Sequence, residues 1–193
     1  MRNATYIFCI LIAGLLLSCT RSDLYARKSK SLDSLNGSVT AMTRELEKID
    51  TSLLKRSITR YTYYKQFVQQ NVSDTLSRTE ADYLQHFLSA GENLEHVQSN
   101  IQQVLLRAQL INSQLQNLAT DIRDKSIEET SVGIYSSRER IEAGKITELG
   151  YAQQRLFMNA MDEYKNSLKG VELLIQSRNH GDLPVIIKDT ISL

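Results

Sequence analysis

The sequence predicts an all-α protein, built as a long antiparallel helical hairpin or as an elongated three-helix coiled-coil bundle. Apolar residues recur at alternating steps of three and four along two long segments, which is the spacing of a coiled-coil seam. One proline and eight glycines among 193 residues are too few turn-forming residues for a many-stranded β protein of this length. Hydrophobic residues make up 41% of the chain and charged residues 23%, which excludes a compositionally disordered protein.

The first 19 residues have the composition of an export signal. Arg2 and the free amine form a positively charged start, and an apolar run at 6–17 follows. As a helix this run is about 18 Å long, too short for a hydrocarbon core of roughly 30 Å and typical of a signal peptide. The run ends in Leu16-Leu17-Ser18-Cys19, which resembles the lipobox of bacterial lipoproteins.

This resemblance implies lipidation of Cys19. The signal peptide, residues 1–18, is removed, a diacylglyceryl group joins the Cys19 sulfur, and an acyl chain such as palmitate joins the new amino terminus. Several acyl chains give lasting membrane anchoring, because each buried methylene contributes about 0.8 kcal/mol. Thr20 stands where an aspartate would resemble an inner-membrane retention signal, so the outer membrane facing the periplasm is favoured, with surface exposure left open. An ordinary secretory signal is the alternative.

The chain after the cleavage site divides into a tether, a helical bundle and a tail. Polar and basic residues after Cys19 predict a tether, either near lipid headgroups or as a plain solvated linker. Pro184 lies beyond every predicted helix and ends helical structure. The expected segments are 19–31 for the lipidated tether, 32–71, 78–130 and 136–178 for the helices of a coiled-coil bundle over 32–178, and 179–193 for the tail.

The first two predicted helices pair around a midpoint at residue 75. Ser77-x-x-Glu80 has the form of a capping box, which starts a helix near residue 78. Opposed residues of an antiparallel hairpin have a constant index sum, and a sum of 150 pairs Leu32 with Leu118 and Phe67 with Tyr83. Its midpoint falls within the turn that the capping box indicates.

The same register places Arg56 and Arg60 on the seam of the first helix. Arginines there are unfavourable unless they reach solvent or carboxylates. One possibility is that they are buried polar residues that set the register of the hairpin or bind a partner. The other is that the apolar stripe shifts to Leu54, Ile58 and Tyr61.

Aromatic residues gather on both sides of the predicted turn, at one tip of the hairpin. Tyrosine is favoured at protein interfaces, so this aromatic tip is a candidate partner-binding site; packing of the hairpin end is the alternative. Its members are Tyr61, Tyr63, Tyr64, Phe67, Tyr83 and Phe87.

The third predicted helix starts at a second capping-box pattern, Ser136-x-x-Glu139, and its glycines allow a kink near Gly144. Residues 139–174 resemble the helical hairpin of the outer-membrane efflux channel family, in which an Ala-Gly turn joins two long helices. The resemblance implies a turn at Ala143-Gly144-Lys145 and a hairpin that docks to such an assembly. The chain lacks the strand pairs of the channel barrel.

No pattern of catalytic or metal-binding residues stands out. His86, His96 and His180 are not spaced as a metal pair, and neither a phosphate loop nor a G-x-S-x-G motif occurs, so we expect no enzyme, no metal and no cofactor. A net charge of +1 excludes a strong whole-chain attraction to nucleic acid. The sequence predicts a lipid-anchored helical scaffold or interaction lipoprotein with an unidentified protein partner or a second copy of itself; an accessory component of an efflux or secretion assembly is the alternative.

Overall fold

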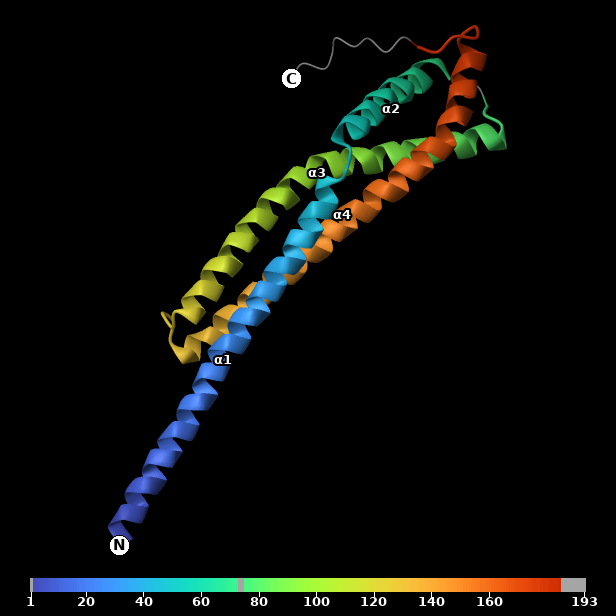
Figure 1. Cartoon of the computed structure of the whole chain (residues 1–193). Helices are drawn as coiled ribbons and strands as arrows, with labels where there is room; N and C mark the ends of the chain where they lie inside the picture. The colour runs from blue at the N-terminus through green and yellow to red at the C-terminus, as the bar shows by residue number, and fades with distance from the viewer. Residues whose placement is uncertain (1, 73–74, 185–193) are drawn as a thin grey trace. The chain divides into compact units, whose positions relative to one another are not determined.

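The chain is all-α, as the heptad spacing predicts. A computed structural model describes residues 2–72 and 75–184, with side chains described from Leu24 onward. Its helices are α1 (Arg2–Glu47), α2 (Thr51–Asn71), α3 (Arg78–Arg123) and α4 (Glu129–Arg178) (Figure 1). They form two compact units, the first made of Met1–Thr43 with Leu106–Glu148 and the second of Arg44–Leu105 with Leu149–Leu193.

The first unit packs segments of α1, α3 and α4 around the predicted seam. The Ser29 hydroxyl donates to the Ala119 carbonyl at 3.2 Å, and the Tyr25 hydroxyl donates to the Ile127 carbonyl at 3.2 Å. Both pairs lie within two residues of the index sum of 150, so the predicted register is confirmed in this unit. Its apolar core includes Leu32, Val39, Met42, Ala108, Ile111, Leu115, Ile122, Val132, Ala143 and Ile146.

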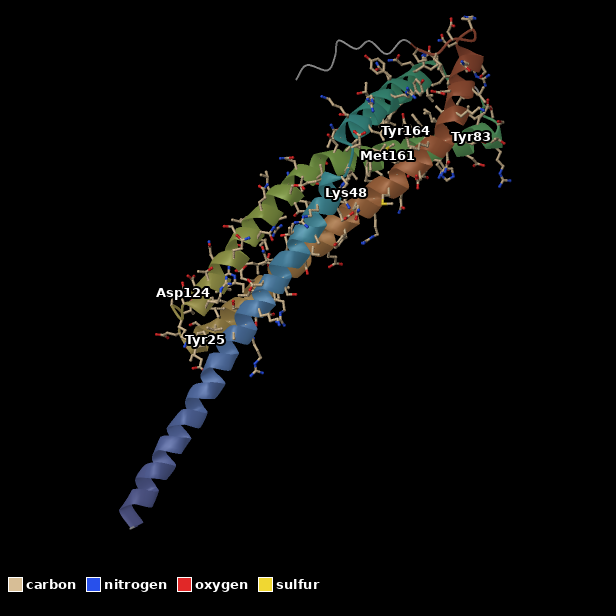
Figure 2. The ribbon with its side chains drawn as sticks, in the orientation of Figure 1. Tyr25, Lys48, Tyr83, Asp124, Met161 and Tyr164 are labelled. Carbon is tan, nitrogen blue, oxygen red and sulfur yellow. The ribbon has the colours of Figure 1, made fainter. Side chains whose placement is uncertain are left out.

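Residues 24–31 do not form the separate tether that their basic composition predicts. α1 is continuous through them. Ser29 is buried against α3, and Tyr25 is buried with its hydroxyl bonded to Ile127 in the connection between α3 and α4. Figure 2 shows Tyr25 beside the turn that carries Asp124. Basic residues lie between these packed positions in the sequence, so the spacing of a buried helix face is not evident there. The backbone of Cys19 lies within α1, but its side chain and those of 1–18 lie outside the described residues.

The prediction of one helix over 32–71 is wrong, because the helix is interrupted at residues 48–50. α1 ends at Glu47, and Asp50 is the N-cap of α2, where its side chain accepts from the Leu53 amide at 2.9 Å. An N-cap carboxylate satisfies an amide that the first helical turn leaves without a partner. The heptad pattern continues across this break, and therefore conceals it.

The break also shifts the apolar stripe in the way the second alternative predicts. Leu54 is 2% and Tyr61 0% exposed, whereas Arg56 and Arg60 lie on the exposed side of α2. The arginines are therefore not buried polar residues on the seam. The buried residues of α2 are Leu54, Ser57, Tyr61, Tyr64 and Val68.

The capping box at the start of α3 is confirmed. The Ser77 amide donates to the Glu80 carboxylate at 2.8 Å, and the Glu80 amide donates to the Ser77 hydroxyl at 3.3 Å. α3 ends at Arg123 rather than near residue 130. Lys125 takes a left-handed conformation with φ of 54°, and the Ser126 amide donates to the Asp121 carbonyl at 2.9 Å, which is a Schellman motif.

α4 starts at Glu129, not at residue 136, and Ser136 is buried inside it. The turn that the efflux-channel resemblance implies at Ala143-Gly144-Lys145 is absent, because α4 runs through it. Ala143 is 2% exposed and Gly144 lies on the exposed side, so the glycine costs helix propensity without interrupting the buried face. Of the predicted tail, 185–193 lies outside the described residues.

Candidate functional site

The predicted aromatic tip divides into interior and surface residues within the second unit. Three of its six residues, Tyr61, Tyr64 and Phe87, are buried and therefore do not contact a partner of the folded chain. They hold the helices together instead, and contact with a partner is left to the others. Tyr61, Tyr64 and Phe87 are buried, Tyr63 and Phe67 are half-buried, and Tyr83 is 41% exposed.

Phe87 of α3 is the centre of this aromatic core. Its ring lies 5.8 Å from that of Tyr61 and 6.1 Å from that of Tyr64, both on α2. On the α4 side it stacks on Tyr164, with ring centroids 5.4 Å apart and planes at 29°. These separations are typical of attractive aromatic pairs, so one ring from α3 joins all three helices of the unit.

Tyr164 is the member of this core that the sequence did not reveal. It occupies a position on the apolar stripe of α4 and is 4% exposed. The index sum that pairs the first two predicted helices does not specify which turn of α4 packs against them. A rule that fixed the register of α4 against α3 would have found it.

Polar groups surround the aromatic core on the α2–α4 side. The Tyr64 hydroxyl donates to the Glu172 carboxylate at 3.1 Å, and an Arg60 nitrogen lies 3.8 Å from the same oxygen. Burial and the charge of Glu172 raise the pKa of Tyr64 to about 12. Burial also raises the pKa of Tyr164 to about 12, opposed by the positive charge of Arg60. Both phenols therefore keep their protons at neutral pH.

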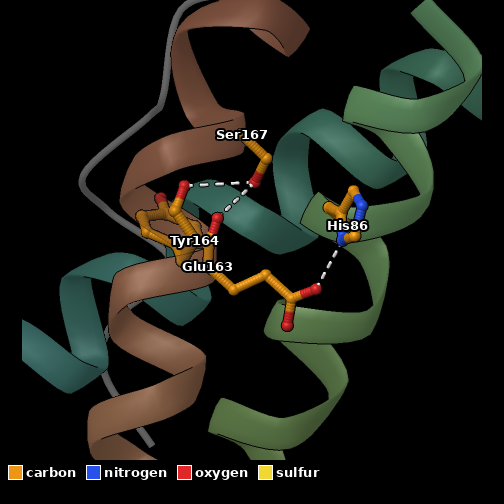
Figure 3. Close-up of polar contacts among 4 residues, drawn as sticks. All are labelled: His86, Glu163, Tyr164 and Ser167. Atoms are coloured by element: carbon orange, nitrogen blue, oxygen red, sulfur yellow. Dashed lines mark hydrogen bonds and ion pairs between the residues drawn. The ribbon is translucent and has the colours of Figure 1, made fainter. Parts of the chain in front are cut away.

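A cavity of about 380 Å³ opens between α3 and α4, lined by Tyr83, His86, Glu163, Asn166 and Ser167. The His86 imidazole contacts the Glu163 carboxylate at 2.7 Å (Figure 3). The Ser167 hydroxyl instead donates to backbone carbonyls of α4, at 2.8 Å to Glu163. A serine nucleophile requires a hydrogen bond to its base, and the Ser167 hydroxyl makes its hydrogen bonds to backbone carbonyls rather than to His86.

A second cavity, the α2–α4 groove, has a volume of about 230 Å³. One face of each helix lines it, at positions spaced by three and four residues. Met161 and Tyr164 contribute from α4, where Figure 2 labels them. Three of its side chains are cationic. The lining residues are Leu53, Arg56, Ser57, Arg60, Met161, Tyr164, Lys165 and Leu168.

Within the described part of the chain, no three His, Cys, Asp or Glu side chains converge as a metal site. Over the same residues, no helix carries an apolar stretch suited to crossing a bilayer. Comparison with family models, with curated proteins and with solved structures finds no match for this chain. Its function must therefore be inferred from its own residues.

Proposed function

We propose that the protein is a lipid-anchored helical scaffold of the bacterial cell envelope, which binds a protein partner through exposed helical faces. The Leu16-Leu17-Ser18-Cys19 sequence supports the anchor, which would hold the chain at the outer membrane on its periplasmic side.

The observation that carries the binding role is the exposed apolar pattern of the first unit. Ile134 is 69% and Ile141 57% exposed, and their separation of seven residues places them on one face of α4. On α3, Leu106 and Leu110 are 57% and 58% exposed and lie one turn apart. Single exposed apolar residues are common, but heptad-spaced ones in one unit are typical of a face that receives another helix.

The aromatic tip has a reduced part in this proposal. Tyr83 is its exposed member and lines the cavity beside His86. The alternative function, an accessory component of an efflux or secretion assembly, depended on a turn at 143–145 through which α4 instead runs as a helix. No further observation favours it.

Site-specific photo-crosslinking in intact cells tests the binding role. A photoreactive residue replaces Leu110 or Ile141 in turn, and Gln116, exposed on another side of α3, serves as the control position. The proposal predicts one crosslinked product of defined mass from Leu110 or Ile141 and none from Gln116. Equal products from all three positions, or no product from any, would contradict it.

A further inference from the structure

The α2–α4 groove collects positive charge that the surrounding residues do not neutralise. Arg56 and Arg60 lie one turn apart on α2, and Lys165 faces them from α4. Glu172 is the carboxylate that reaches this set, 3.8 Å from Arg60. Within the described residues, the side chains of Arg56 and Lys165 form no ion pair. Like charges held around one cavity repel one another, so the groove favours an anion.

A buried hydroxyl in the same groove lacks a partner. Tyr164 lines the groove and is 4% exposed, and within the described part of the chain its hydroxyl has no hydrogen-bond partner. Buried polar groups without partners are rare in folded proteins. The phenol keeps its proton because burial raises its pKa to about 12, so its hydroxyl is a hydrogen-bond donor without an acceptor among the described residues.

We propose that the α2–α4 groove binds a phosphate group, held by Arg56, Arg60 and Lys165 with the Tyr164 hydroxyl as a further donor. Three cations opposed by one carboxylate leave an excess of positive charge, which the negative charge of a phosphate group offsets. Guanidinium groups match phosphate oxygens with paired donors. Met161 and Leu168 line the groove beside these cations. This site is independent of the partner-binding role proposed above.

The phosphate has two chemical sources that this geometry does not separate, a free phosphate or monoester and the diester headgroup of a phospholipid. Calorimetric titration of the full chain in detergent distinguishes them with two soluble probes, inorganic phosphate and glycerophosphoglycerol. Acetate at the same ionic strength is the reference anion. Saturable one-to-one binding of either probe, about tenfold or more tighter than acetate, is the expected result. The tighter probe identifies the source, and equal or weaker binding than acetate for both overturns the proposal.

Variants then locate the binding site. Changing Arg56→Gln together with Lys165→Gln lowers the affinity for the tighter probe about tenfold or more, while Lys55→Gln, an exposed neighbour outside the groove, leaves it unchanged. Glu172→Gln removes the competing charge and tightens binding about threefold. Thermal unfolding confirms that each variant is folded. Wild-type affinity in the double variant, or no gain in Glu172→Gln, would place the anion elsewhere and overturn the assignment.

Discussion

Gly91 of α3 faces the ring of Tyr61 on α2 so closely that a methyl group at position 91 would overlap the ring atoms Cδ2, Cε2 and Cγ. The ring is fully buried, so it can move aside only by displacing the atoms packed around it. We predict that Gly91→Ala lowers the free energy of unfolding by about 1–3 kcal/mol, as overpacking does, although alanine has the better helix propensity. Chemical denaturation measures this change.

Gly144→Ala is the matched control, because no atom lies within 4 Å of a Cβ at that position of α4. Alanine there raises stability by about 0.5–1 kcal/mol through helix propensity and a less flexible unfolded chain. Opposite signs for the two substitutions support the close approach of α2 and α3. A stabilising Gly91→Ala would show that the Tyr61 ring does not occupy that place.

The backbone of Lys125 adopts an unfavourable conformation at the end of α3. Its φ of 54° is a region that side chains with a Cβ disfavour by about 1–2 kcal/mol. We predict that Lys125→Gly stabilises the chain by about 0.5–1 kcal/mol, because glycine adopts this conformation freely. Lys125→Ala, measured in the same denaturation experiment, should bring no gain. If glycine and alanine behaved alike, the Schellman motif would not be the end of the helix.

Asp50 starts α2 by accepting from the Leu53 amide. Asp50→Ala leaves that amide without its acceptor and is expected to cost about 0.5–2 kcal/mol. Asp50→Asn retains an accepting oxygen and should cost much less. Circular dichroism followed during urea unfolding provides both values. Equal losses in the two variants would indicate that charge rather than capping matters at this position.

Alkaline pH is expected to weaken the aromatic core. Tyr64 and Tyr164 ionise near 10.0 when exposed, whereas in the folded chain their pKa values are raised to about 12, chiefly by burial. Their contribution to stability is therefore fully present below about pH 10 and is lost as the pH rises through about 12, because the unfolded chain releases these protons first. Denaturation midpoints measured across this range should fall, and the fall should be smaller in Tyr64→Phe. An identical pH dependence in that variant would argue against a buried phenol at position 64.

Much of the α1–α3 pairing was predictable because it depends on local periodicity. The seam from Leu32 to Met42 and the capping box at Ser77 fixed a register that the Ser29–Ala119 contact confirms. The break at Asp50 was not predictable from periodicity, since a heptad pattern continues through it. Asp50 followed by Thr and Ser did offer a capping signal, but a weak one.

The candidate sites were less predictable than the helices. Tyr61 and Phe87 are predicted to belong to a binding site because they are aromatic. Residue type alone does not distinguish a ring in a core from one on a surface. The α2–α4 groove joins Arg56 to Lys165, more than one hundred residues later in the chain. That two such distant residues line one cavity depends on the register of α4, which no local pattern specifies.

The most direct test of lipid anchoring is the mass of the amino-terminal peptide of the protein purified from membranes. We predict a peptide that begins at Cys19 and carries a diacylglyceryl group and an amide-linked acyl chain, with residues 1–18 absent. A Cys19→Ala variant should lack the lipid and retain the preceding residues. An unmodified Cys19, or a mature chain that begins at any other residue, would contradict the proposal that this helical protein is a lipoprotein.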